Sequence, residues 1–314
     1  MNVEALRGKM EDGGFTLVSR GNNRRGRAKP LDGKAAGRAL AAAEGIAESS
    51  AADEADIARR IDAAVLELRT SAFWAKLDAL VAREAPVESI VCLGVGSYGS
   101  SVSARYQLAL ALLLRETLLG VSAAADAAPP PPTAAGGAAL DVYDPVLSEA
   151  EVAFARARGC GLPARNEEGR RAVARRTLFF MPHCGRQLYA NVVAANWGGE
   201  ALGRVLILGN SFAAYADALT DAQTADAARW CALARATPFA TEEACGEPAG
   251  DGGAFRNAFN SLSLHTFAPP RLPPPADAAW AAPFADRPPE ESLPCALHAH
   301  ILGADDQDAH AAVT

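Results

Sequence analysis

The sequence predicts an α/β fold: a Rossmann-like, mostly parallel, doubly wound sheet with helices on both faces, preceded by an N-terminal helix. Short, continuous apolar runs, typical of strands buried on both faces, occur at residues 88–96, 177–184 and 204–212. These runs end in glycine, in Pro182 or in other small residues. Stretches with helical periodicity separate them, as crossover connections between parallel strands require.

Helices are the first elements that we expect. Between residues 53 and 83, apolar side chains such as Ile57, Ile61 and Val65 recur every three or four positions, which predicts one amphipathic helix or two. The strand at 88–96 is followed by an apolar stretch long enough to form the next helix, residues 101–116.

The second half of the domain repeats this alternation. Ser148 is a typical N-cap residue and Gly159 a typical helix end. The expected elements are, in order, strand 139–145, helix 148–159, a short strand near 160–164, strand 177–184, helix 186–197, strand 204–212 and helix 213–222.

Three segments are expected to lie outside the folded core. Residues 1–50 are predicted to be a disordered basic segment, and residues 271–314 a disordered tail. A low-complexity insertion, residues 120–139, interrupts the domain, which we place at residues 51–270. The N-terminal segment contains a basic run that is either a solvated tail or a nuclear-import or nucleic-acid patch: Arg20, Arg24, Arg25, Arg27 and Lys29.

Composition narrows the class of protein. The net charge of −7 argues against a surface that coats nucleic acid, except through the basic run. The longest apolar stretch, Leu108 to Leu114, is far shorter than a membrane span, and the N-terminus lacks a secretory apolar region. We therefore expect a cytoplasmic protein without membrane association, and one that is also nuclear if the basic run is an import patch. Its six cysteines are scattered, which predicts reduced thiols.

A glycine-rich turn is the strongest local signal for a ligand. Residues 94–99, GVGSYG, lie between a strand and a helix, where glycines let a phosphate or nucleoside approach the backbone. Asp141 and Asp144 lie at the end of the next predicted strand, where an acidic partner for a ribose belongs. No lysine follows Gly99, so the turn is not a Walker loop. A ligand cradle and a plain tight turn both fit.

Two further motifs could carry chemistry. Residues 209–213, GNSFA, partly resemble a nucleophile elbow, with His265 and Asp217 available to complete a triad around Ser211, but a small-residue turn fits as well. His183 and Cys184 could ligate a metal or form a catalytic pair. Successive residues leaving a strand point in opposite directions, so we predict no metal site and interpret His183 as a loop residue beside a cleft.

Most of these candidates follow the carboxyl ends of predicted strands, where open α/β sheets form a ligand crevice. Arg105, within the first helix after the glycine-rich turn, is expected to help line it. The predicted ligand-binding residues are Gly94, Gly96, Ser97, Arg105, Asp144, His183, Asn210 and Ser211. They identify no cofactor and no catalytic residue.

Taken together, several blocks resemble one family. They are CLGVGSYGSSVSARYQLALALLL, DPVLSEAEVAF with NEEGRRAV, TLFFMPHCGRQLYANVVAANW, and VLILGNSF with AFNSLSLHTF. In this order they resemble the core domain of the Sensitivity To Red Light Reduced-like family. The resemblance implies a regulatory role, in phytochrome signalling and the circadian clock in plants, and in rhythms and the control of haem biosynthesis in animals. The long insertion departs from the compact family pattern.

Three hypotheses follow. The first is a regulatory protein with a small-molecule or nucleotide ligand at the sheet's carboxyl edge, and with protein partners. The alternative is a nucleotide- or S-adenosylmethionine-dependent transferase that uses the same cleft, with His183 and Asp144 as its acid–base pair. A DNA-binding regulator would depend on residues 1–40.

Overall fold

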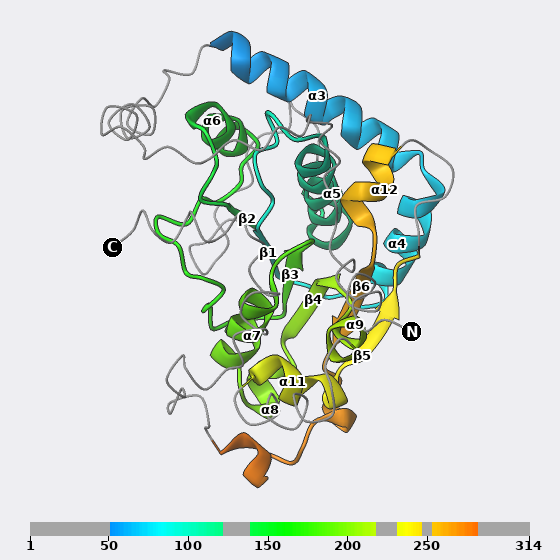
Figure 1. The fold of residues 1–314 in the computed structure, drawn as a ribbon, viewed down its shortest axis with the longest axis vertical. Helices are drawn as coiled ribbons and strands as arrows, with labels where there is room; N and C mark the ends of the chain where they lie inside the picture. The colour runs from blue at the N-terminus through cyan, green and yellow to red at the C-terminus, as the bar shows by residue number, and fades with distance from the viewer. Residues whose placement is uncertain (1–50, 122–138, 218–230, 247–252, 282–314) are drawn as a thin grey trace, which may run out of the picture. The chain divides into compact units, whose positions relative to one another are not determined.

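A six-stranded sheet forms the centre of the structure, a computed structural model that describes residues 51–121, 139–217, 231–246 and 253–281. All of these residues belong to one unit, residues 47–314. The strands lie in the order β2-β1-β3-β4-β6-β5 (Figure 1). Their bounds are β1 Ser89–Leu93, β2 Leu140–Tyr143, β3 Thr177–Met181, β4 Val205–Asn210, β5 Thr241–Ala244 and β6 Leu262–Thr266.

The sheet is mixed, which differs from the mostly parallel sheet that the sequence predicts. Strands β2, β1, β3 and β4 are parallel neighbours, but β6 pairs antiparallel with both β4 and β5. Neither β5 nor β6 is predicted from the sequence. The reason for β6 is that polar Ser263 and His265 alternate with its leucines and are nevertheless buried, so the strand lacks a continuous apolar run. The protein is therefore α/β with a mixed, open sheet, and a doubly wound Rossmann-like arrangement is not confirmed.

The predicted helix at 53–83 is two helices, because Ser71 interrupts it and accepts a hydrogen bond from the Trp74 amide as an N-cap. Ser101 and Ser148 cap the next two helices in the same way. The helices are α3 Ala51–Arg69, α4 Ala72–Ala82, α5 Val102–Leu119, α6 Glu149–Ala157, α7 Arg186–Ala195, α8 Gly199–Leu202, α9 Phe212–Asp217, α11 Ala232–Ala236 and α12 Gly253–Phe259.

Helices cover both faces of the sheet (Figure 1). Strand β1 supplies both cores in alternation: Ile90 and Cys92 face α3 to α6 and α12, whereas Val91 and Leu93 face α7 and α11. Helix α5 lies between the sheet and α3, which explains why residues 108–114 are buried all round. Among the described residues, no helix is both long and apolar enough to span a membrane.

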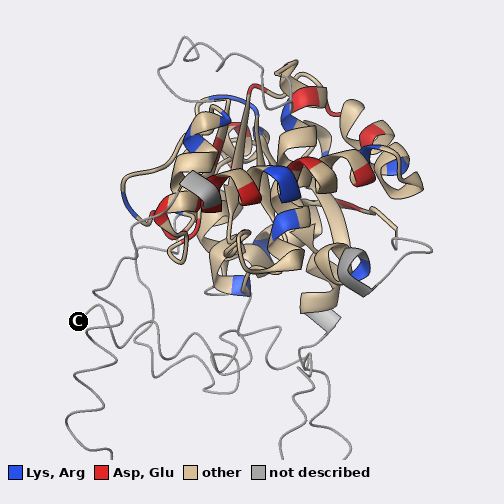
Figure 2. Ribbon diagram, turned by 90° about the horizontal axis from the view of Figure 1, so that it is seen from above, with Lys and Arg blue, Asp and Glu red and all other residues tan. Residues whose placement is uncertain are grey.

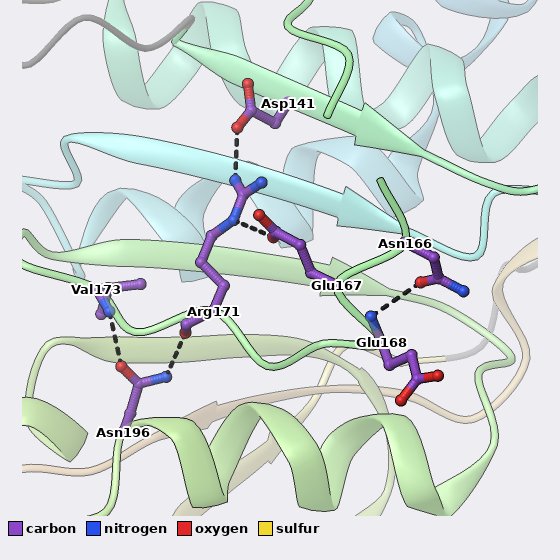
Figure 3. Close-up of polar contacts among 7 residues, drawn as sticks. All are labelled: Asp141, Asn166, Glu167, Glu168, Arg171, Val173 and Asn196. Atoms are coloured by element: carbon purple, nitrogen blue, oxygen red, sulfur yellow. Dashed lines mark hydrogen bonds and ion pairs between the residues drawn. The ribbon is translucent and has the colours of Figure 1, made fainter. Parts of the chain in front are cut away.

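The predicted short strand near 160–164 is a single bridge between Gly161 and Asp141. After it, the loop at 166–173 is tied to the sheet and to α7 by polar side chains (Figure 3). The Arg171 side chain pairs with Asp141 of β2 and with Glu167, and the Arg171 carbonyl accepts a hydrogen bond from Asn196. A single backbone bridge and, further along the chain, a side-chain tether thus connect this segment to β2.

Residues 269–281 lie within and beside the segment predicted as a disordered tail, and they include the 3₁₀ helices η2 (Pro269–Arg271) and η3 (Ala278–Trp280). The Trp280 ring contacts the Trp197 ring at a centroid distance of 5.2 Å. Several predictions fall outside the described residues: the basic N-terminal run, nearly all of the insertion, the second half of helix 213–222, and residues 282–314.

Candidate functional site

The four parallel strands end at one edge of the sheet, which we call the carboxyl edge: the residues that end or directly follow β1, β2, β3 and β4. Seven of the eight predicted site residues lie at this edge. Gly94, Gly96 and Ser97 follow β1, Asp144 follows β2, and His183 follows β3. Asn210 ends β4, and Ser211 follows it. The eighth, Arg105, lies in the first turn of α5.

The glycine-rich turn adopts the backbone conformation that glycine allows, with φ of 68° at Gly94 and 70° at Gly96. Asp144 folds back onto this turn. One of its carboxylate oxygens accepts from the Gly96 amide at 2.8 Å, and the other accepts from the Val146 amide at 3.0 Å. The acidic residue that a ribose would need is therefore bonded to the turn itself.

A second carboxylate, that of Glu151 in α6, also binds the glycine-rich turn. Its Oε1 accepts from the Gly99 amide at 2.7 Å and from the Ser97 hydroxyl at 2.8 Å, and its Oε2 accepts from the Ser148 amide at 2.7 Å. The residue is 1% exposed. A phosphate at this turn would meet two resident anions that already use the Gly96 and Gly99 amides. This geometry favours the tight-turn interpretation of the glycines.

Arg105 binds a backbone carbonyl of the same turn. Its Nε donates to the Tyr98 carbonyl at 3.4 Å, and Arg60 of α3 donates to the Gly99 carbonyl at 3.4 Å. Burial, and then the neighbouring charge of Arg60, lower the pKa of Arg105. Both guanidinium groups thus bind turn carbonyls.

The side chains of His183 and Cys184, which follow β3, point in different directions, as predicted: Cys184 is buried and His183 is exposed. The Cys184 thiol is buried and donates to the Leu93 carbonyl at 3.3 Å. Burial, and secondarily the charge of Asp144, raise the pKa of Cys184, so the thiol stays protonated at neutral pH. It is a packing group rather than a nucleophile or a metal ligand. Within the described ranges, no group of three His, Cys, Asp or Glu side chains could hold a metal ion.

His183 is exposed and has a φ of 58°, which is uncommon for a residue with a side chain. Its amide donates to the Asn210 side chain at 2.9 Å, and its Nε2 lies 3.2 Å from the Ala258 carbonyl. Because a carbonyl only accepts, Nε2 carries the proton, and Nδ1 of the neutral ring is an acceptor. The strained backbone holds this imidazole at the rim of the edge.

Asn210 connects the ends of β3 and β4. Its Nδ2 donates to the Tyr215 hydroxyl at 2.8 Å and to the Cys184 carbonyl at 3.3 Å, while its backbone amide donates to the Tyr189 hydroxyl at 2.9 Å. Tyr189 packs so closely on β4 that a Cβ at Gly209 would lie 2.5 Å from its hydroxyl oxygen. The position of His183 is therefore set by a rigid network.

Ser211 is bonded to a carboxylate rather than to an imidazole. Burial raises the pKa of Glu242, but hydrogen bonds from His265, Ser211 and the Ala213 amide outweigh that effect and lower it to about 2. A carboxylate so stabilised is a poor general base for a serine. The Asp217 side chain lies outside the described residues. The arrangement around Ser211 is thus not that of a hydrolase triad.

Glu151, Glu242, Tyr189 and Tyr215 are the site residues that sequence reasoning missed. The spacing of Ser148 and Glu151 is a capping-box pattern, and it could have identified Glu151 as a structural carboxylate. Glu242 carries no comparable signal, because it lies on an edge strand that the sequence does not reveal.

The fold and the edge together define an α/β protein with an open, mixed sheet and a cluster of polar side chains at the ends of four parallel strands. The model of the SRR1 domain matches residues 68–266, so the chain belongs to the SRR1 domain family. This confirms the family resemblance of the sequence.

Three relatives illustrate the match. The Arabidopsis thaliana protein SENSITIVITY TO RED LIGHT REDUCED 1 is 33% identical over 180 residues, which is 57% of this chain and 58% of that protein. The Mus musculus SRR1-like protein is 40% identical over 123 residues, 39% of this chain and 43% of that protein. The Drosophila melanogaster SRR1-like protein is 28% identical over 201 residues, 62% of this chain and 60% of that protein. The alignments thus span 43% to 60% of these relatives. No solved structure matches the chain.

Proposed function

We propose that the chain is a regulatory protein of a light-response or circadian pathway that responds to a small ligand at the carboxyl edge. The observation that carries this proposal is the SRR1 domain match over residues 68–266, which includes every predicted site residue. The name of the Arabidopsis relative refers to sensitivity to red light.

The groups offered to a ligand are hydrogen-bonding groups rather than a phosphate cradle. The exposed His183 ring has an acceptor at Nδ1, and the Asp144 carboxylate is half-buried at the next strand end. The amides at Gly96 and Gly99 are occupied by carboxylates. The transferase alternative gains no support from this arrangement, and we do not propose it.

The light-response role is tested by complementation. The chain would be expressed in Arabidopsis seedlings that lack the red-light relative, and their growth response to red light would be measured. We expect the wild-type chain to restore the response, and we expect His183→Ala and Asn210→Ala to restore it less because the edge loses its organisation. Leu66→Ala, at a side chain that is 64% exposed on α3, is the matched control. A well-expressed, folded wild-type chain that restores nothing would contradict the proposal.

The ligand is tested separately by mass spectrometry of small molecules retained on natively purified protein. A molecule that the wild type retains and Asn210→Ala loses would support a site at the carboxyl edge. Equal retention by both proteins, or retention by neither, would remove the ligand from the proposal while leaving the pathway role open to complementation.

We further propose a cytoplasmic and nuclear location, with the run Arg20 to Lys29 as the import segment. Acidic and basic residues are interspersed over the described helices (Figure 2), so we expect no contact with nucleic acid except through this run. A fluorescent fusion with and without residues 1–40 tests the location: loss of the nuclear signal on deletion is expected.

A further inference from the structure

Backbone amides at the start of a helix have no partner within the helix and ordinarily face solvent. In the first turn of α9, side chains accept hydrogen bonds from these amides instead. The Phe212 amide lies 3.3 Å from Nε2 of His265, on β6. The Ala213 amide donates to Oε2 of Glu242, on β5, at 3.0 Å, and the Ala214 amide donates to the Ser211 hydroxyl at 3.0 Å. Two antiparallel strands at the end of the sheet thus fix the turn that follows Asn210.

The hydrogen bonds of His265 define its neutral state. Its Nδ1 lies 3.1 Å from the Ile207 carbonyl, which can only accept, so Nδ1 carries a proton. In the neutral ring, Nε2 then has a lone pair and accepts from the Phe212 amide. The ring is fully buried and stacks on the Phe212 ring at a centroid distance of 3.7 Å.

A second contact of Nε2 conflicts with this state. The same nitrogen lies 3.4 Å from Oε2 of Glu242, so two lone pairs face each other while the ring is neutral. A proton taken from solvent onto Nε2 would turn this repulsion into a charge-assisted hydrogen bond. The Phe212 amide would then lose its acceptor, because one nitrogen cannot donate to Glu242 and accept from Phe212 at once.

The charged group that the His265 ring contacts is Glu242. From β4 the ring meets the Ile207 carbonyl, and from α9 it meets the Phe212 ring and amide. On β5, the neighbouring Glu243 pairs with Arg83 instead. Besides the contact with His265, hydrogen bonds from Ser211 and from the Ala213 amide lower the pKa of Glu242, and these two bonds favour its ionised form whether or not His265 donates to it.

We propose that His265 and Glu242 form a proton-controlled clamp on the first turn of α9, which regulates the carboxyl edge through Asn210. In the neutral state the clamp binds the Phe212 amide and holds the turn. In the protonated state His265 binds Glu242, and the first turn of α9, which follows Asn210 and Ser211, loses its hydrogen bond to β6. The regulatory role of the clamp rests on the proposed function of the carboxyl edge. Its test, however, requires neither the ligand nor the pathway.

The test is a pH titration of the full, isotopically labelled chain by nuclear magnetic resonance, between about pH 5 and 8. The readouts are the His265 ring nitrogens, the backbone amides of Phe212 and Ala213, and the side-chain amide of Asn210. We expect all of them to shift along one curve with one midpoint. Constant Phe212 and Ala213 signals would overturn the proposal, and a Phe212 response that does not reach Asn210 would overturn regulation of the edge.

Variants assign the transition to this pair. His265→Gln should abolish the shift at Phe212. Glu242→Gln keeps an oxygen acceptor for Ala213 but removes the charge, so the transition should move to lower pH. Glu243→Gln, one residue along the same strand, is the matched control and should leave it unchanged. A transition that persists in His265→Gln, or is the same in Glu242→Gln and Glu243→Gln, would overturn the proposal.

Discussion

At the scale of single residues, Gly94 is fixed by two independent constraints: its φ of 68°, and the Cys184 thiol, which a Cβ would approach to 2.5 Å. Gly94→Ala should therefore lower the free energy of unfolding by about 1 kcal/mol through the backbone conformation, and by a further 1–3 kcal/mol, roughly, through overpacking. Gly120→Ala separates the two costs, because Gly120 has a φ of 66° but nothing within 4 Å of its Cβ position. The measurement is the free energy of unfolding in urea. Equal losses in the two variants would show that the Cys184 contact is relaxed at no cost.

Glu242 is a single residue that should make the free energy of unfolding depend on pH. Its pKa is about 2 in the folded protein, against an ordinary value of 4.5. A carboxylate with a lowered folded-state pKa contributes stability above the unfolded pKa, and loses it as the pH falls through the folded value. The free energy of unfolding should therefore fall more steeply between pH 4.5 and about 2 in the wild type than in Glu242→Gln. Urea titrations at several pH values measure this, with Glu243→Gln expected to follow the wild type.

At the scale of elements, one buried carboxylate joins α6 to the turn between β1 and α5. Because Glu151 accepts hydrogen bonds from Ser97, Gly99 and Ser148, Glu151→Gln should lose about 1.5–3 kcal/mol of stability, and the turn at 94–99 should exchange its amide hydrogens faster. Glu149→Gln, exposed in the same first turn of α6, should lose only about 0.3–1 kcal/mol of helix-dipole interaction. Unfolding and hydrogen exchange measure both variants. Similar effects for the two would contradict a role for Glu151 beyond capping.

Elements differ in how well the sequence predicts them, and burial explains the difference. Strands β1, β3 and β4 are continuous apolar runs because both of their faces are covered, so they are predicted correctly. Strand β5 is short and half-exposed, and its sequence TEEA has no strand pattern. The segment after β2 is joined to it by a single backbone bridge at Gly161 and, ten residues further on, by the ion pair of Arg171 with Asp141. Interactions between distant residues decide these cases, and local periodicity does not record them.

At the scale of the whole molecule, the sequence predicts where the candidate site lies better than what its groups do. Parallel neighbours bring the chain-distant Asp144, His183 and Asn210 to one edge, which follows from alternating strands and helices alone. Their hydrogen bonds do not follow from it. Asp144 is bonded to the Gly96 amide, and Glu242 reaches Ser211 only because β5 and β6 add an antiparallel end to the sheet. A strand that is not predicted cannot supply its side chains to a predicted site.

The last described segment, residues 269–281, also belongs to the scale of the whole molecule, because it contains η2 and η3 and packs near α7, α8 and α11. Trp280 stacks edge-on against Trp197, and its Nε1 donates to the Pro273 carbonyl at 3.2 Å, while Arg235 of α11 donates to the Ala279 carbonyl at 2.7 Å. Trp280→Ala removes the ring that holds this segment down, so local opening should become more frequent. Cleavage by trypsin after Arg271 follows the population of the open segment, and a local loss of about 1.4 kcal/mol makes it about tenfold faster.

The fragment that ends at Arg271 would be followed by mass spectrometry, with Leu66→Ala as a control that removes an exposed apolar side chain from α3, away from the segment. The Arg271 side chain is itself bound to the Phe239 carbonyl at 3.2 Å, so cleavage requires the segment to detach from the 3₁₀ turn after α11. We expect the wild type and Leu66→Ala to be cleaved slowly and alike, and Trp280→Ala to be cleaved faster with little change in global unfolding. If all three proteins were cleaved at the same rate, the aromatic contact would not be what holds the segment, and the Arg235 and Arg271 hydrogen bonds to backbone carbonyls would have to do so.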